Sequence, residues 1–274
     1  MKTKIAIALM VLAASLLSDR IYSQGIYAKI SAGYGLQMSS QNIDYFNFTN
    51  FSIDTASSTQ ELVKISLGKG LIFEGAVGYM FNKNIGAELG VSYLLGAKTK
   101  TEQTLYGSLR NNSLSANMLR INPSFVISCG FEKINPYAKL GLIIGFGKIM
   151  YEDDYTSAGG NVISEKMELS GGIALGLNAG AGVIYNLNEK LSLFGEINMV
   201  NLSYSPTQGR LTKSTIDGTD RLPDLTTSEK EVDFVESYTT DTNTPYTHTE
   251  PRKELKESFP FGSAGLNVGI KITL

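Results

Sequence analysis

Residues 260–274 read PFGSAGLNVGIKITL, and this stretch decides the fold. From Ala264 to Leu274 every second residue is apolar, and the residues between them are Gly265, Asn267, Gly269, Lys271 and Thr273. This period of two is typical of a β-strand with one apolar face and one wet face. Because the strand runs to the last residue, we expect its free edge to pair with the first strand of the chain and close a barrel.

The same alternation recurs in seven earlier segments. These are residues 26–36, 71–79, 85–95, 119–128, 136–146, 173–185 and 191–199. The connections between them alternate in length, with short turns after the second, fourth and sixth strands. Long polar loops are expected at residues 37–69, 96–115, 147–169 and 204–258. The pattern predicts an all-β fold, an eight-stranded antiparallel up-and-down β-barrel, as a single domain over residues 25–274.

Alternation alone does not say whether the apolar face points outward or inward. The residues opposite the apolar face are mostly Gly, Ser and Asn with a few charges, which suits a narrow polar lumen. Barrels that cross a membrane have strands of about 9–11 residues, short turns at one end and longer loops at the other. The asymmetric connections, together with the export signal described next, therefore favour a transmembrane barrel over a soluble one.

The N-terminus has the pattern of a secretory signal. Lys2 and Lys4 precede an apolar run from Ile5 to Leu17, and a more polar segment follows. The run is too short to cross a bilayer as a helix, which takes roughly 20 residues. Residues 1–24 are thus predicted to be a signal peptide cleaved near residues 23–24, with no lipid anchor because that region contains no cysteine.

Composition excludes several classes of function. The net charge of −2 gives no basis for binding nucleic acid. The single cysteine, Cys129, excludes a disulfide framework and a cysteine metal cluster, and the only histidine is His248. No motif for a cofactor or a metal stands out, so we expect none and predict that the protein is not an enzyme.

Seven charged residues fall on the face opposite the apolar one, and most lie near the same rim of the predicted barrel. They are Lys29, Glu74, Glu88, Arg120, Lys139, Glu196 and Lys271. Charges enclosed in a narrow barrel must pair, because an unpaired buried charge is very costly. We predict an ion-pair network that plugs the lumen, and the alternative is a gate that opens when the pairs exchange partners.

The long loops hold the remaining candidates. Tyr45, Phe46, Phe48 and Phe51 lie within seven residues of each other, and they either cap the barrel mouth or form a contact patch for a protein or glycan partner. Residues 204–258 mix Thr, Asp, Glu and Lys, so this loop is either disordered or ordered against a partner. The run Glu152-Asp153-Asp154 is either a solvated patch or a divalent-cation site.

The chain resembles the small eight-stranded outer-membrane barrels of the OmpA and OmpX type, and in particular the porin-family barrels of Bacteroidota. The resemblance spans the whole predicted mature chain and rests on the strand pattern, NPYAKLG at residues 135–141, LFGE at residues 193–196 and the last strand. It implies a Gram-negative outer membrane, contact with its lipid, and recognition of the C-terminal strand by the barrel-insertion machinery. The family's terminal strand normally ends in an aromatic residue, where this chain has Leu274.

Three functions follow as hypotheses. The first is a non-enzymatic barrel with a plugged lumen and a structural or loop-mediated binding role. The second is a small porin that passes ions or small solutes. The third, ranked lowest, is a hydrolase on the outer loops with His248 as its base, although no neighbouring residue in the sequence is placed to orient that side chain.

Overall fold

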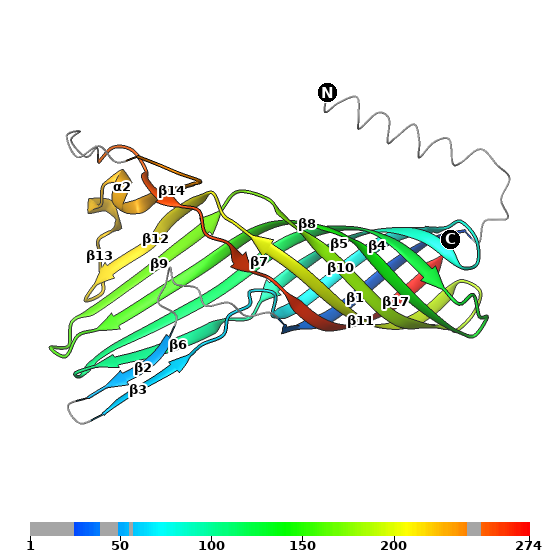
Figure 1. Cartoon of the computed structure of the whole chain (residues 1–274), viewed down its shortest axis with the longest axis horizontal. Coiled ribbons are helices and arrows are strands. Elements are labelled where there is room, and N and C mark those ends of the chain that lie inside the picture. Colours follow the sequence, from blue (N-terminus) through cyan, green and yellow to red (C-terminus); the bar gives the residue numbers. More distant parts are fainter. Residues whose placement is uncertain (1–24, 39–48, 55–56, 240–247) are drawn as a thin grey trace.

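The computed structural model describes residues 25–38, 49–54, 57–239 and 248–274, which are almost entirely β-structure (Figure 1). Eight strands pair antiparallel in a ring that closes between the first and the last, as the sequence predicts. These wall strands are β1 (Gly25–Gln37), β4 (Gly70–Met80), β5 (Ile85–Gly96), β7 (Ser108–Ser128), β8 (Ile134–Thr156), β10 (Ala174–Asn186), β11 (Leu191–Tyr204) and β17 (Ser263–Thr273).

The strands are staggered around the ring. A hydrogen-bond ladder that starts at Tyr27 returns to β1 at Gln37, ten residues further along, after passing through Gly78, Glu88, Ser124, Gly141, Asn178, Val200 and Ser263. Such a stagger requires strands that tilt relative to the barrel axis, and eight strands leave an interior just wide enough for side chains. The lumen is therefore a place where side chains from all eight strands meet.

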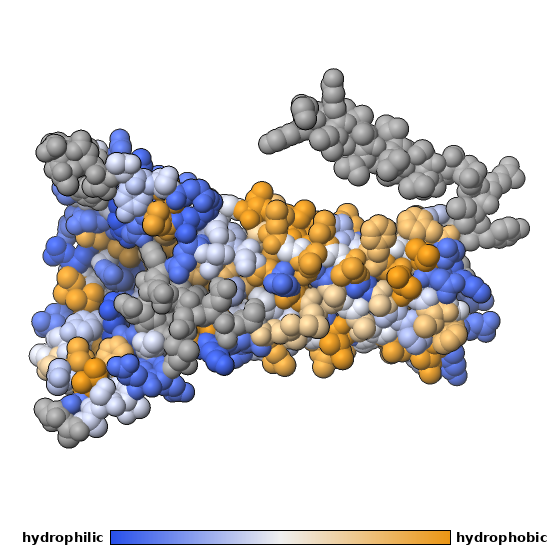
Figure 2. Space-filling view, in the orientation of Figure 1, coloured by the Kyte–Doolittle hydropathy of each residue, from blue (hydrophilic) through white to orange (hydrophobic). Residues whose placement is uncertain are grey.

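The apolar face of each wall strand points outward. Ile30, Phe125 and Leu175 are 70%, 69% and 69% exposed, whereas Lys29, Glu88 and Arg120 on the opposite face are buried. Figure 2 shows these hydrophobic residues as a band around the barrel half of the molecule, with mainly hydrophilic residues beyond it. Apolar residues outside and polar residues inside are the arrangement of a barrel that is surrounded by lipid.

Strands β7 and β8 are 21 and 23 residues long, about twice the length that a bilayer requires. The prediction of polar loops at residues 96–115 and 147–169 is therefore wrong, because these residues continue the wall strands and form two β-hairpins. We call the end of the barrel with the three short turns the turn end. The opposite end, where the strands continue beyond the hydrophobic band, is the extended end.

The extended end is an open sheet. Its additional strands are β2 (Thr49–Ile53), β3 (Ser58–Leu62), β6 (Thr99–Leu105), β9 (Val162–Ser170), β12 (Gln208–Ile216), β13 (Thr219–Asp220), β14 (Glu231–Val235), β15 (Arg252–Leu255) and β16 (Phe259–Pro260). The 3-10 helix η2 (Leu222–Asp224) and the helix α2 (Thr227–Lys230) connect β13 to β14. The described part of the predicted loop 204–258 is thus ordered within the chain itself, through pairing of β12 with β9 and β14. In the described part of the chain, no helix is long and apolar enough to cross a membrane.

Two hairpins at the extended end share one type of turn but differ in its first residue. Tyr106 and Gly107 join β6 to β7 with φ angles of 44° and 84°, and Asp217 and Gly218 join β12 to β13 with φ angles of 49° and 80°. Two-residue turns with positive φ at both positions favour Asn-Gly or Asp-Gly. A bulky residue such as Tyr106 is strained in this conformation, and its side chain is 64% exposed.

Replacing Tyr106 with asparagine should stabilise the β6–β7 hairpin. We expect a gain of about 1 kcal/mol, the lower end of the cost of a residue held in an unfavourable φ region. The measurement is hydrogen exchange of the β6 amides, which should slow about fivefold. Asp217→Asn is the matched control and should leave exchange unchanged. Faster exchange in Tyr106→Asn would contradict the strain.

Candidate functional site

Lys139 on β8 is the centre of an ionic layer that crosses the lumen near the turn end. Its Nζ lies 2.9 Å from Glu196, 3.4 Å from Glu74 and 3.8 Å from Glu88, on strands β11, β4 and β5. The Nζ of Lys29 on β1 lies 2.8 Å from Glu88. Five of the seven predicted lumen residues are therefore brought together. All five belong to wall strands and project into the lumen.

Two tyrosines complete the ionic layer on the side that faces the turn end. The Tyr27 hydroxyl donates to Glu88 at 2.9 Å, and the Tyr137 hydroxyl donates to Glu196 at 2.8 Å. Lys29 also lies over the Tyr137 ring, with its Nζ 4.6 Å from the ring centroid. Each carboxylate at these two positions thus has a cation and a hydroxyl as partners, which offsets part of the cost of burial.

Glycines opposite the layer leave room for its large side chains. A Cβ on Gly78 would lie 2.1 Å from the Tyr27 ring, and a Cβ on Gly180 would lie 3.1 Å from Glu196 and 3.2 Å from Lys139. Any side chain in place of the glycine hydrogen at these positions would push the Tyr27 ring or the Lys139–Glu196 ion pair aside. The many glycines of the wet face therefore allow charged side chains to reach across a narrow lumen.

Two residues of the predicted network do not join an ion pair with any described residue. Arg120 is buried on β7 and has no carboxylate within the 4.0 Å ion-pair distance. Lys271 on β17 lies at the turn end, with its Nζ 4.4 Å from the centroid of the Tyr27 ring. The prediction of their inward direction is correct. Arg120 is level with Glu74 through Ser92 but forms no ion pair with it, and Lys271 lies closer to the turn end than the carboxylates do.

The part of the lumen toward the extended end is mainly apolar. The expectation of a polar lumen therefore holds only for the part near the turn end. Inward residues of the wall strands at this level are hydrophobic and buried. They include Ile72, Leu94, Met118, Ile143, Val200 and Leu202. In the sequence, these residues are separated from the inward charges of their strands by even numbers of residues, so they point to the same side. That they form one layer can be seen only once the stagger of the strands is known.

Two chain segments fold into the barrel mouth and complete what we call the apolar seal, formed by Ile65, Leu67, Phe259 and Phe261 with the wall residues around them. All four are at most 2% exposed. The Leu67 amide donates to the Pro260 carbonyl at 2.8 Å, and the Phe261 amide donates to the Leu202 carbonyl at 2.8 Å. The seal therefore ties the first and last long connections to each other and to the wall.

Ionic layer and apolar seal together fill the lumen in two chemically different ways. A permeating ion would have to displace the paired charges around Lys139 and then cross a layer built mainly of apolar side chains. Sequence reasoning found the first layer from the inward charges. The second was missed, although Ile65/Leu67 and Phe259/Phe261 repeat the period of two inside otherwise polar stretches.

The loop candidates are spread over different parts of the structure. Phe51 is half-buried on β2 and pairs with Gln103 of β6. Tyr45, Phe46 and Phe48 lie outside the described residues. His248 is exposed, and its backbone carbonyl accepts a hydrogen bond from the Ser228 amide at 3.4 Å.

The predicted acidic cluster is part of β8, so its three side chains alternate between the two faces. Asp153 is 8% exposed and forms an ion pair with Arg110, whereas Glu152 points to the other face. Glu152 lies 2.6 Å from Lys98 and 3.4 Å from Lys166, and it accepts a hydrogen bond from Ser113 at 3.0 Å. Glu152 and Asp153 therefore form ion pairs that hold neighbouring strands together.

Glu152 should make the stability of the extended end depend on pH. The hydrogen bond from Lys98 lowers the pKa of Glu152 from an ordinary value of 4.5 to about 2. The stabilisation is therefore complete above pH 4.5 and is lost as the pH falls toward 2. Glu152→Gln should lower the urea midpoint slightly at pH 7, since the pair is partly exposed, and match the wild type near pH 2.

Asp154→Asn, a change of an exposed carboxylate on the same strand, is the control for that experiment. A Glu152→Gln deficit that stays constant from pH 7 down to pH 2 would contradict the assigned ion pair.

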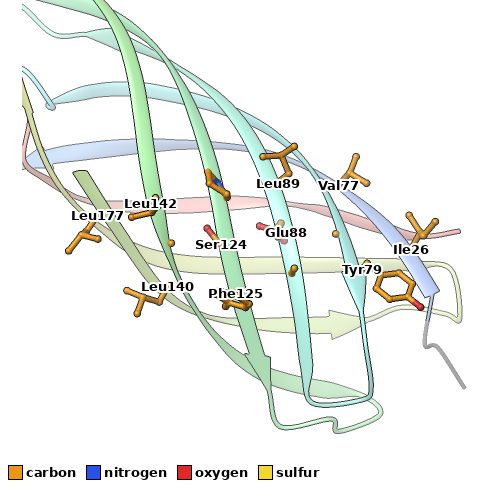
Figure 3. A pocket seen from close by; sticks show the side chains of 14 residues that line it. Ile26, Val77, Tyr79, Glu88, Leu89, Ser124, Phe125, Leu140, Leu142 and Leu177 are labelled. Atoms are coloured by element: carbon orange, nitrogen blue, oxygen red, sulfur yellow. The ribbon is translucent and has the colours of Figure 1, made fainter. Parts of the chain in front are cut away.

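A shallow depression of about 750 Å³ lies on the outer face of the wall (Figure 3). It extends over six consecutive wall strands, from β1 through β4, β5, β7 and β8 to β10. Its apolar lining includes Val77, Leu89, Phe125, Leu140 and Leu142, all of which belong to the outward set of the wall strands. Glu88 and Ser124 contribute to its lining from the neighbouring inward positions. The depression is thus part of the hydrophobic band rather than of the charged lumen.

The comparison with protein families agrees with this architecture. The model of the family described as "Outer membrane protein beta-barrel domain" matches residues 5–220, most of the chain. A search of curated proteins finds no match. Three solved structures are similar over nearly all of both chains. Neisserial surface protein A is 11% identical with a TM-score of 0.38, covering 92% of this chain and 99% of its own.

The second is CarO2 of Acinetobacter baumannii, which is 12% identical with a TM-score of 0.36, covering 91% of this chain and 99% of its own. The third is the attachment invasion locus protein Ail of Yersinia pestis, solved in complex with the heparin analogue sucrose octasulfate. It is 13% identical with a TM-score of 0.33, covering 90% of this chain and 99% of its own.

Proposed function

Because this chain belongs to the outer-membrane β-barrel family, we propose that it is a non-enzymatic barrel with a closed lumen that displays a binding surface at its extended end. The family locates the barrel in the outer membrane of a Gram-negative bacterium. In that membrane the turn end faces the periplasm, because short turns are periplasmic and longer connections are extracellular. Residues 1–24, the predicted signal peptide, lie outside the described residues.

The two-layer closure of the lumen is the observation that carries this proposal. Lys139 holds three carboxylates within 3.8 Å, and the apolar seal lies above them with Phe261 fully buried. The side chains that fill such a lumen stabilise the barrel and leave no open path for ions or solutes. The working surface is then the part that lies outside the membrane.

The extended end is well suited to display. Strands β7 and β8 continue from the membrane wall into the outer sheet, so the sheet is held rigidly by the barrel. The exposed hydrophobic residues Leu105, Tyr106 and Ile216 lie at the ends of its hairpins. Tyrosine is a common anchor residue in protein interfaces. We propose a protein or glycan partner at this end, with membrane lipid around the hydrophobic band.

We also propose that the insertion machinery recognises β17. This strand ends at Thr273, and Leu274 after it is 78% exposed. An exposed apolar residue at this position offers a contact in place of the aromatic residue usual in the family.

The second candidate is a narrow porin, favoured by the ring of charges around Lys139, since charged rings select ions in pores. Single-channel recording in planar bilayers separates the two functions, with Glu196→Gln as the informative variant. For a closed lumen, we expect no channels in the wild type and a less stable Glu196→Gln variant that admits ions only rarely. For a porin, the wild type conducts and Glu196→Gln changes mainly the ratio of cation to anion permeability.

A further inference from the structure

A cup of about 570 Å³ lies at the turn end of the lumen. Its lining comes from β1, β4, β8, β10, β11, β17 and the turns that follow β7 and β10. Tyr27 belongs both to this cup and to the ionic layer, where its hydroxyl donates to Glu88, so the cup borders the ionic layer. Sites for small molecules usually measure about 300–1,000 Å³. The cup is therefore large enough for a small organic ligand.

Lys271 is the half-buried cation of the cup. It lies directly opposite Lys29 in the register of β1 and β17, and like charges in this position destabilise a sheet. Lys29 is compensated by Glu88 at 2.8 Å, whereas the Nζ of Lys271 lies over the Tyr27 ring, 4.4 Å from its centroid. No carboxylate of the described residues lies within the 4.0 Å ion-pair distance of this Nζ. Lys271 therefore lacks the counter-charge that Lys29 has.

The other charges of the lining lie in the turns. They are Glu132, Lys133 and Glu189, and all three are exposed. The lining as a whole thus holds two lysines and two glutamates, but neither glutamate is paired with Lys271. The charge of the cup is balanced in number and uneven in space, with its positive centre on the half-buried side next to the ionic layer.

Polar and apolar groups of the lining lie on different strands. Ser192 on β11 is level with Lys271, and Thr273 is the next inward residue on β17, so two hydroxyls flank the ammonium. The apolar lining comes from Met80 at the end of β4, Ile184 on β10 and Phe131 in the turn after β7. A ligand that fits this lining has an anionic group for Lys271 and an apolar body for the remaining surface.

We propose that the cup binds a small organic carboxylate with an apolar body, taken up from the periplasm. The Lys271 ammonium pairs with the carboxylate and so gains the counter-charge that the described residues do not supply. Tyr27, Ile184 and Phe131 contact the apolar body. The ligand stays on the periplasmic side of the ionic layer, so its binding requires no open path through the lumen. This site is independent of what the extended end binds.

The direct test is a titration of the protein, folded in detergent micelles, with sodium benzoate. Benzamide has nearly the same shape without the charge and serves as the control ligand. We expect saturable chemical-shift changes at the backbone amides of Ser192, Lys271 and Thr273 in ¹H–¹⁵N NMR spectra with benzoate, and none with benzamide at the same concentrations. The absence of saturable changes with benzoate would overturn the proposal, as would equal changes with both ligands.

Two lysine variants test the role of the ammonium. Lys271→Gln should weaken benzoate binding about tenfold or more, because it removes a hydrogen bond between charged groups. Lys190→Gln changes an exposed lysine in the turn after β10 that does not line the cup, and it should bind benzoate like the wild type. An unchanged affinity of Lys271→Gln, or an equal loss in both variants, would contradict the site.

The wild type alone decides the proposal where Lys271→Gln does not fold. We expect intermolecular nuclear Overhauser effects between the benzoate ring protons and the side chains of Tyr27 and Ile184. Such effects only with detergent, or only with residues outside the cup, would overturn the proposal.

Discussion

Replacement of Lys139 by methionine lowers the free energy of unfolding by about 3–5 kcal/mol, the cost of removing one partner from a buried ion pair. Three carboxylates depend on this ammonium, at 2.9, 3.4 and 3.8 Å. Methionine has a similar length and leaves no large cavity, so the loss reports on charge rather than on packing. The measurement is urea unfolding of the protein folded in phospholipid vesicles.

Lys29→Met is the matched control for this change. Glu88 would still have Lys139 at 3.8 Å and the Tyr27 hydroxyl at 2.9 Å, so a smaller loss is expected. Adding Glu196→Gln to Lys139→Met should recover part of the stability, because it removes one uncompensated charge. A Lys139→Met variant within about 1 kcal/mol of the wild type, the value of an exposed ion pair, would contradict a buried ionic layer.

Phe261→Ala is expected to cost about 3–5 kcal/mol, as deletion of a fully buried phenylalanine does. The ring is 0% exposed and packs edge-on against Tyr204, with ring centroids 5.9 Å apart. The ring belongs to the same buried cluster as Ile65 and Leu67. The backbone hydrogen bonds from Leu67 to Pro260 and from Phe261 to Leu202 limit how far these segments can close the space that the ring leaves. Urea unfolding in vesicles measures the loss.

The control is Phe131→Ala, which removes the same side chain from a turn at the other end, where it is 61% exposed. A surface change of this kind should stay within about 0.5 kcal/mol. Equal losses for Phe261→Ala and Phe131→Ala would mean that no apolar seal exists at the mouth.

Most of the wall could be predicted from the sequence. The turn ends of the strands agree within one or two residues, for example residues 71–79 against β4 at Gly70–Met80 and residues 85–95 against β5 at Ile85–Gly96. Inside the membrane, one face must be apolar, so hydrophobicity itself reports the strand period. Beyond the membrane, both faces of β8 carry polar or charged groups such as Glu152 and Asp153, and the strand continues without that signal.

The inward direction of Lys139 and its partners also followed from the period of two. Their pairing did not, because it depends on how far each strand is shifted against the next, and the ten-residue stagger is a property of the closed ring. The same register places Arg120 level with Glu74, through Ser92, although the two form no ion pair. Ile65 and Phe261 were hidden for another reason, since two apolar residues in a polar stretch are too few to predict a folded segment.

The measurement that tests the closed lumen most directly is the conductance of the purified wild-type protein in planar bilayers at high salt, with folding and insertion verified by heat-shifted gel mobility. The ionic layer around Lys139 and the seal around Phe261 predict a silent bilayer. Steady open channels from the folded protein would contradict this account and make a narrow porin the better description.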